Sequence, residues 1–224
     1  MRIRNKQITP TKIICLGRNY LNHIKETGAA IPQEPILFPK TLNCLIGNKE
    51  PIIYPKILYN NSDLNRVDHE IELAFIMGKQ GKNIPQSNAY EYIEGYTIFL
   101  DITARKLQRK DISSKKPWFR SKSFDTFGPI GPKIVSPTEI TDPHQLDLEL
   151  RVNGEIKQKS NTKHLLFKIP KLVEYISAYF TLMPGDIIAT GTPSGISPLN
   201  PRDKIEATIE GIGTLINPVI LEKD

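Results

Sequence analysis

Two glutamates in a strand-like run are the residues of this chain whose types and spacing most clearly suggest chemistry. Glu70 and Glu72 lie two positions apart in residues 68–75, where apolar residues alternate with acidic or small ones. Successive side chains of a strand point to opposite faces, so the two carboxylates project from the same face, about 7 Å apart. Like charges at this separation either face water or share a cation between them.

A third carboxylate, Asp101, closes a second strand-like run over residues 96–101. Taken alone, such a carboxylate is typical of a helix cap or a turn, and alternating acidic residues are typical of a half-exposed strand. Asp101 together with Glu70 and Glu72 would instead provide three oxygen ligands, which Mg²⁺ and Mn²⁺ prefer. Spacing alone leaves both the solvated and the metal-binding alternatives open.

A histidine and a glutamate three residues apart, His23 and Glu26, form a second candidate cluster. Residues 18–26 have the pattern of a short helix, on which residues three apart share a face. A carboxylate bonded to an imidazole fixes its tautomer and raises its basicity, which is how proteins build a general base. The alternative is an exposed polar helix.

Basic residues provide two further features. Lys122 lies among serines and aromatic residues in an irregular segment, where it would either be exposed or bind a carboxylate or oxyanion.

The densest basic stretch covers residues 105–110 and continues with Lys115 and Lys116. It predicts a solvated helix face, or a surface that attracts an anionic substrate or nucleic acid. The other lysines lack aromatic interleaving, which makes nucleic acid the weaker of the last two alternatives.

The elements that must position these residues are mostly strands. Strands at short intervals with few helices predict a β-rich α+β fold. The Asn153-Gly154 pair predicts a hairpin turn, because both residues accept positive φ. Residues 56–68 are expected to form a loop, residues 115–126 to be irregular and residues 128–132 to form a rigid turn. Expected strands are 12–16, 34–40, 68–75, 96–101, 146–152, 155–159, 187–190 and parts of 204–220; expected helices are 18–26, 104–110 and 170–180.

Composition indicates a globular protein. The 224 residues are 39% hydrophobic and 24% charged, with a net charge of +6. No linker or repeat divides them, so residues 1–224 are predicted to form one domain, with residues 1–11 as an extension or first strand. No apolar run approaches a membrane span or a signal-peptide core, so we expect a cytoplasmic protein without membrane contact. Cys15 and Cys44 are expected to be buried thiols, and the scattered histidines argue against zinc.

Eight short motifs, in the same order along the chain, resemble those of the fumarylacetoacetate hydrolase family. The similarity is to its small single-domain branch, which includes acylpyruvate hydrolases and oxaloacetate decarboxylases. It extends over residues 12–220. The motifs are residues 17–20 with His23 and Glu26, 38–40, 69–73, 101–105 with Gln108, 122–132, 152–155, 185–193 and 209–213.

This resemblance implies roles for the candidate residues. Glu70, Glu72 and Asp101 would hold one Mg²⁺ or Mn²⁺ ion per chain. His23 and Glu26 would form a water-activating pair on a mobile lid, and Lys122 would face the substrate. The residues implied to line the pocket are Arg18, Lys40, Gln108 and Thr192.

The resemblance also implies a fold, a β-rich sandwich or roll with short helices, and a homodimer. The implied activity is metal-dependent hydrolysis of a C–C bond in a small anionic 2-oxo acid, of the acylpyruvate or fumarylpyruvate type, through a metal-stabilised enolate. Alternatives on the same scaffold are an oxaloacetate decarboxylase and a 2-hydroxyhepta-2,4-diene-1,7-dioate isomerase or tautomerase. A basic nucleic-acid-binding protein and a non-catalytic metal-binding scaffold are alternatives of other classes.

Two positions depart from the family pattern. Thr41 follows Lys40 where the family often has proline, which would shift the loop that carries Lys40. His164 stands where many members have a small or acidic residue, so substrate choice at that wall is expected to differ.

Overall fold

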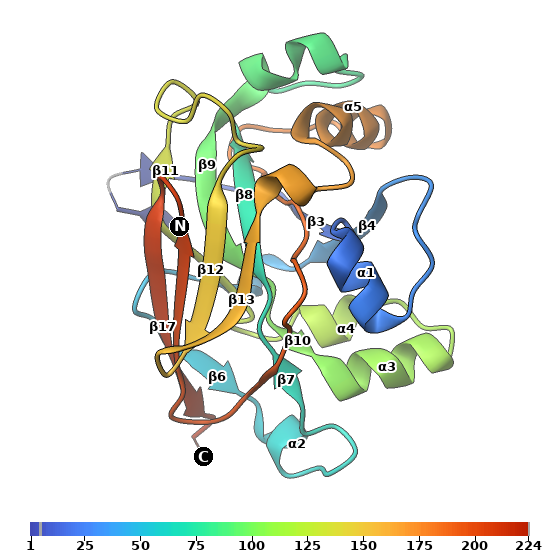
Figure 1. Ribbon diagram of the computed structural model, residues 1–224, viewed down its shortest axis with the longest axis vertical. Helices are drawn as coiled ribbons and strands as arrows, with labels where there is room; N and C mark the ends of the chain where they lie inside the picture. The colour runs from blue at the N-terminus through green and yellow to red at the C-terminus, as the bar shows by residue number, and fades with distance from the viewer. Residues whose placement is uncertain (5, 224) are drawn as a thin grey trace.

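A mixed seven-stranded sheet lies at the centre of the computed structural model, which describes residues 1–4 and 6–223 (Figure 1). Its strand order is β4-β3-β14-β8-β9-β11-β5. The pairs β14–β3 and β11–β5 are parallel and the others are antiparallel. The strands are β3 (Ile13–Gly17), β4 (Ile36–Lys40), β5 (Leu45–Ile46), β8 (Ile71–Met77), β9 (Ile93–Leu100), β11 (Gly128–Val135) and β14 (Ile187–Ala189).

A five-stranded sheet, in the order β13-β12-β16-β17-β6, packs on the central one. Contacts join β12 to β8, β16 to β9 and β17 to β11. In β16, buried residues alternate with more exposed ones, as expected where one face covers a core. The strands are β6 (Ile52–Tyr54), β12 (Asp147–Val152), β13 (Glu155–Asn161), β16 (Lys204–Ile209) and β17 (Gly213–Leu221).

Two small sheets complete the strand content. The order β10-β7-β15 forms a three-stranded sheet next to the ends of β8 and β9, and β1 pairs with β2. The strands are β1 (Arg2–Ile3), β2 (Lys6–Gln7), β7 (Val67–Asp68), β10 (Thr103–Ala104) and β15 (Pro198–Leu199).

Short helices lie on one side of the sheets, where α1, α3, α4 and α5 are grouped in Figure 1. Helix α1 ends at Gly28, whose φ of 66° is the left-handed conformation that glycine adopts most readily. Helix α5 has Pro170 in its first turn and buries an apolar stripe. The helices are α1 (Leu21–Thr27), α2 (Lys56–Tyr59), α3 (Arg105–Ser113), α4 (Phe119–Lys122) and α5 (Ile169–Tyr179), with 3₁₀ turns η1 (Leu42–Cys44), η2 (Gln86–Tyr92) and η3 (Thr162–His164).

The predicted β-rich α+β class is confirmed, and several local predictions are corrected. The strand expected over residues 68–75 is divided, because Asp68 pairs in the three-stranded sheet whereas Ile71 begins β8 in the central one. Strand β8 is buried along its whole length, so the half-exposed alternative is wrong. Residues 128–132, expected to form a turn, lie in β11, whose pairing with β9 shifts register after Gly131.

The segments expected to be loop or irregular contain two short helices, α2 and α4.

Cys15 and Cys44 are buried free thiols, as predicted. Within residues 1–4 and 6–223, no helix is both long and apolar enough to cross a membrane.

Candidate active site

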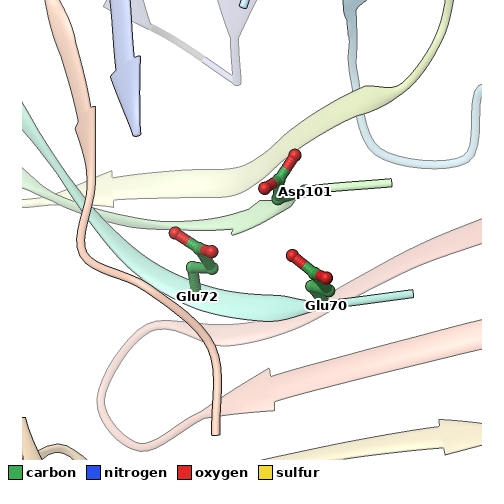
Figure 2. Close-up of side chains that lie close together, drawn as sticks. All are labelled: Glu70, Glu72 and Asp101. Atoms are coloured by element: carbon green, nitrogen blue, oxygen red, sulfur yellow. The ribbon is translucent and has the colours of Figure 1, made fainter. Parts of the chain in front are cut away.

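Three buried carboxylates meet where β8 and β9 come together. Glu72 lies in β8, Glu70 immediately precedes it, and Asp101 immediately follows β9. Because Ile71 pairs with Leu100 across the ladder, Glu70 lies opposite Asp101, and the Asp101 N–H donates to the Glu70 carbonyl at 2.9 Å. One oxygen from each of the three carboxylates lies within 4.8 Å of the others, and Figure 2 shows the groups converging. We call Glu70, Glu72 and Asp101 the acidic triad.

Cations hold two of the three triad members. The Lys122 ammonium lies 2.9 Å from Glu70 Oε2 and also pairs with Asp101. Lys40 Nζ lies 2.7 Å from Asp101 Oδ1. Arg105 pairs with Glu70. Burial by itself would raise the pKa of Glu70, but Lys122 and Arg105 hold it well below its usual range.

Glu72 is the triad member without a cationic partner among the described residues. Its Oε2 accepts a hydrogen bond of 2.8 Å from the Gly191 N–H. Burial and the neighbouring Asp101 and Glu70 charges raise its pKa well above the ordinary value. A buried set of three carboxylates, one of them uncompensated, fits a hard divalent cation such as Mg²⁺ or Mn²⁺ by charge and by donor atom.

A pocket of about 400 Å³ opens at the triad. Glu70 and Glu72 contribute to its floor, and the other lining residues come from β3, β4, α1, α3, α4 and the loops that join them. Of the residues expected at the site, those that line the pocket are Arg18, His23, Glu26, Glu70, Glu72, Gln108, Lys122 and Thr192.

Lys40, also expected to line the pocket, is placed differently. It is not among the described residues of the pocket wall, and it lies buried behind Asp101, where Nζ also donates to the Ile102 carbonyl at 3.2 Å. The Thr41 N–H that follows lies 3.3 Å from Ser123 Oγ. Lys40 therefore orients a triad carboxylate from behind and has no direct access to the pocket.

His23 and Glu26 face each other on α1. His23 Nδ1 donates to Glu26 Oε2 at 3.0 Å, and Glu26 Oε1 accepts the Gly195 N–H at 2.9 Å. Burial by itself would raise the pKa of Glu26, but these hydrogen bonds lower it, so the carboxylate stays ionised. With Nδ1 donating, Nε2 is the basic nitrogen of the ring. The pair is thus arranged as a base and the carboxylate that orients it.

Lys122 remains charged although it is only 2% exposed. Burial lowers its pKa, but Asp101 and Glu70 more than reverse that effect, and the pKa lies above the ordinary value. Its Nζ also lies 4.9 Å from the centre of the Phe38 ring. The expected alternative of an exposed lysine is therefore wrong.

A hydrogen-bond network that the sequence did not indicate holds Thr192. The Thr192 hydroxyl donates to the Ile71 carbonyl at 2.9 Å and accepts from Gln158 Nε2 at 2.8 Å. Gln158 Oε1 accepts from the Ile71 N–H and from His69 Nδ1, at 3.1 and 3.0 Å. His69 Nε2 then accepts from the Ser197 hydroxyl at 2.8 Å. Gln158 comes from the second sheet, so no local pattern could have linked it to Thr192.

Aromatic residues form one wall of the pocket, and these also were not predicted. Phe38 and Trp118 pack edge to face with their ring centres 5.4 Å apart. Gly17 lies against this wall, and a Cβ there would come within 2.8 Å of the Trp118 ring. Any larger residue where β3 ends would therefore have to displace the Trp118 ring. His164, expected at a wall, is exposed and is not among the described lining residues.

Comparisons with known proteins find a family model and several relatives that match nearly the whole chain. The family model described as fumarylacetoacetate (FAA) hydrolase C-terminal matches residues 12–220. The chain is 43% identical over 202 residues to "Oxaloacetate tautomerase FAHD1, mitochondrial" of Arabidopsis thaliana, a match that covers 90% of this chain and 87% of that protein.

Two solved structures are similar over nearly the whole chain. Fumarylpyruvate hydrolase from Pseudomonas aeruginosa, solved in complex with Mn²⁺ and pyruvate, gives a TM-score of 0.89 at 31% identity, covering 97% of this chain and 93% of that one. The 2-hydroxyhepta-2,4-diene-1,7-dioate isomerase from Mycobacterium marinum gives 0.84 at 39% identity, covering 97% and 77%.

Proposed function

Because this chain belongs to the fumarylacetoacetate hydrolase family, we propose that it is a divalent-metal-dependent enzyme that cleaves a C–C bond in a small 2-oxo acid. The substrate would be of the acylpyruvate or fumarylpyruvate type. The observation that carries the proposal is that two members of the acidic triad, Glu70 and Glu72, line the same pocket as a histidine oriented by a carboxylate.

The triad would hold the metal ion, and Mg²⁺ or Mn²⁺ bound there supplies Lewis acidity to the 2-oxo group of the substrate. His23 Nε2 takes a proton from water, and the ionised Glu26 stabilises the imidazolium that results. Lys122, charged and buried, donates to the oxygen that becomes negative when hydroxide adds to the distal carbonyl. Collapse of this adduct breaks the C–C bond, leaves the distal part as a carboxylic acid and releases the 2-oxo acid part as its enolate, which takes up the proton held by His23. Phe38 and Trp118 exclude bulk water from this side of the pocket.

A second candidate is tautomerisation, isomerisation or decarboxylation of an oxo acid, with oxaloacetate as the decarboxylase or tautomerase substrate. The 43% identical relative named as an oxaloacetate tautomerase supports it. These reactions need the triad and Lys122 but no attacking water. Hydrolysis therefore requires His23 to take a proton from water, whereas the second candidate does not.

His23→Ala separates the candidates. We expect it to lower C–C hydrolysis by about 100-fold or more, because the general base is lost, and to leave an enolisation that uses no water less affected. The measurement is a turnover screen with acetylpyruvate, fumarylpyruvate and oxaloacetate, with Mg²⁺ or Mn²⁺ and with EDTA. Lys25→Ala, on the exposed side of the same helix, is the control. Full turnover in EDTA, or hydrolysis unchanged in His23→Ala, would contradict the mechanism.

A further inference from the structure

Ile71, the residue between Glu70 and Glu72, turns both of its backbone polar groups away from β9. The Asp101 N–H donates to the Glu70 carbonyl, so these two residues form a hydrogen-bonded pair of the β8–β9 ladder. The next pair of an antiparallel ladder is not hydrogen-bonded, so the Ile71 N–H and carbonyl point to the opposite side. On that side β14 ends opposite Ala74, before it reaches Ile71. The two groups therefore need partners from outside the sheet.

Gln158 closes a ring of three hydrogen bonds around Ile71. Its Oε1 accepts the Ile71 N–H at 3.1 Å, its Nε2 donates to the Thr192 hydroxyl at 2.8 Å, and that hydroxyl donates to the Ile71 carbonyl at 2.9 Å. The orientation of the amide is fixed, because the Ile71 N–H can only donate and the Pro193 carbonyl, 2.9 Å from Nε2, can only accept. Gln158 thus takes the place of a neighbouring strand where β14 has ended.

The same glutamine holds the loop that follows β14, over residues 190–195. The Gly191 N–H in this loop donates to Glu72 Oε2 at 2.8 Å. The Gly195 N–H donates to Glu26 Oε1 at 2.9 Å. The glutamine bonds to the loop between these two donors. Its position therefore affects a triad carboxylate near one end of the loop and the carboxylate that orients His23 at the other.

Gln158 points toward this loop because β13 is irregular at that point. It is the one buried residue of β13, an edge strand that lies wholly in the described part of the chain. The pairing with β12 shifts register between Gln158 and Ile156, so Lys157 is an extra residue, and such a bulge redirects the side chains beside it. A Cβ at Gly195 would collide with the Lys157 carbonyl. The loop therefore packs directly on the backbone of the bulge.

We propose that Gln158 is a positioning residue of the metal site. It fixes the peptide between Glu70 and Glu72 and the loop that bonds to Glu72, and so holds these carboxylates where they converge with Asp101. Ligands that are held in place by such outer contacts bind a metal ion more tightly. The inference rests on the proposed function and deepens it, because it makes metal binding depend on a residue from the second sheet.

Gln158→Met tests this by Mn²⁺ binding, without a need for turnover. Methionine has about the length of glutamine but makes no strong hydrogen bond, so Ile71 and the loop lose the contacts that fix them. Loss of an outer partner of a metal site costs about 10–100-fold in affinity, so the Kd for Mn²⁺ in calorimetry should rise by about 10-fold or more. The electron paramagnetic resonance spectrum of the bound Mn²⁺ should change as well, because it reports the geometry of the ligands.

Asn217→Leu is the matched control. Asn217 also fixes backbone through a buried side-chain amide, which donates to the Gly47 and Glu50 carbonyls at 2.9 and 2.8 Å. None of these three is among the described residues that line the pocket at the triad. The variant should lower the stability of the fold, as Gln158→Met does, but change the Kd for Mn²⁺ by less than about 2-fold and leave the spectrum unchanged.

A milder pair of variants covers the case in which Gln158→Met does not fold. Thr192→Val removes the hydroxyl that bonds to the Ile71 carbonyl, whereas Thr192→Ser keeps it. We expect Thr192→Val to raise the Kd for Mn²⁺ by about 3-fold or more, the effect of one lost hydrogen bond, and Thr192→Ser to bind Mn²⁺ as the wild type does.

The inference is overturned by an unchanged Kd or an unchanged spectrum in Gln158→Met, or by an equal change in Asn217→Leu. If Gln158→Met does not fold, equal affinities in Thr192→Val and Thr192→Ser overturn it. In these cases the proposed function stands, provided that the wild type binds Mn²⁺ more tightly than Glu72→Gln. If Mn²⁺ binds both of these equally, or binds neither, the proposed function fails and the inference fails with it.

Discussion

At the scale of single residues, Glu72 differs from its neighbours in a way that bears on metal binding. Glu70 and Asp101 are neutralised by Lys122, Lys40 and Arg105, whereas Glu72 has only the Gly191 N–H among the described residues. In the absence of a metal ion its charge is unfavourable, which is why its pKa is raised. The ionised form of Glu72 is the least favourable of the three without a metal ion, so a bound ion would stabilise Glu72 more than the other two carboxylates.

Glu72→Gln tests this reasoning. Glutamine keeps an oxygen that accepts the Gly191 N–H but removes a ligand charge, so Mn²⁺ affinity should fall by about 100-fold or more. The metal-free variant should be at least as stable as the wild type, because a repulsive buried charge is gone. Calorimetric titration with Mn²⁺ and urea denaturation in EDTA measure the two effects. Unchanged Mn²⁺ affinity would remove Glu72 from the ligand set.

The residues that sequence reasoning missed are those whose partners are distant in the chain. Carboxylates at alternating strand positions are visible in the sequence, as Glu70 and Glu72 show. Gln158 is not, because its role depends on a second sheet that brings β13 next to Thr192. The burial of Lys40 behind Asp101 is equally invisible, since it depends on the pairing of β3 and β4 and not on the residues around it.

Gln158→Leu should destabilise the fold. The change leaves the buried Ile71 N–H and the Pro193 carbonyl without the partners that Gln158 provides, and each unsatisfied group costs about 1–3 kcal/mol. We expect the free energy of unfolding to fall by about 2–4 kcal/mol in urea denaturation. Lys159→Leu, on an exposed position of the same strand, should change it by less than about 0.5 kcal/mol. A small effect of Gln158→Leu would mean that other groups satisfy the network.

At the scale of elements, strand existence was easier to predict than strand limits. The Asn153-Gly154 turn and its two strands are present as β12 and β13, because the hairpin signal is local. The end of β7 and the start of β8 could not be predicted, since apolar alternation continues while the chain passes from one sheet to another. The prolines of β11 indicate a turn in the sequence, yet Pro129 lies opposite Ile46 of β5, and Ile130 and Gly131 pair with β9.

The start of helix α5 depends on a histidine from another segment. The Ile169 N–H donates to His144 Nε2 at 3.1 Å, so the ring is neutral and its proton lies on Nδ1. Burial and Lys168 lower the pKa of His144, while Asp142 opposes them. The N–H groups in the first turn of a helix have no acceptor within the helix. Protonation of Nε2 would therefore leave the Ile169 N–H without the acceptor that His144 provides.

The stability of the protein should therefore depend on pH through His144. Its folded pKa lies below the unfolded value of about 6.5, so its contribution is complete above about pH 6.5 and is lost as pH falls toward the folded pKa. We expect wild type to exceed His144→Ala by about 1 kcal/mol in free energy of unfolding at pH 7.5, and by less at pH 5.5. Denaturation of both proteins at several pH values measures this. His164→Ala, at an exposed position, is the control, and parallel curves for wild type and His144→Ala would contradict the prediction.

At the scale of the whole molecule, the site is assembled from segments that lie far apart in the chain. Strand β3 pairs in parallel with β14, which places residues 13–15 beside residues 187–189 and so brings the segments of Arg18 and Thr192 to one pocket. The fold class followed from strand spacing, but the sheet order could not, because pairing between distant strands leaves no local signal. The single catalytic domain, the homodimer and the cytoplasmic location stay predictions.

Metal binding should stabilise the whole fold, because the triad carboxylates meet only when β8 and β9 are paired. A ligand that binds only the native state stabilises it by about 2.7 kcal/mol at 100 times its Kd. For a chain of this size, 1 kcal/mol shifts Tm by about 2–4 °C, so Mn²⁺ should raise Tm by about 5–11 °C over the value in EDTA.

The same experiment on Glu72→Gln shows whether the shift arises at the triad. With one ligand missing and Mn²⁺ at the concentration used for wild type, the rise in Tm should fall below about 2 °C, because affinity drops while the total ion is constant. An ion bound to scattered surface carboxylates would stabilise both proteins equally, since Glu72 is buried and does not contribute to the surface. Equal shifts in wild type and Glu72→Gln would therefore place the ion elsewhere, and without an ion at the triad the proposed chemistry has no Lewis acid.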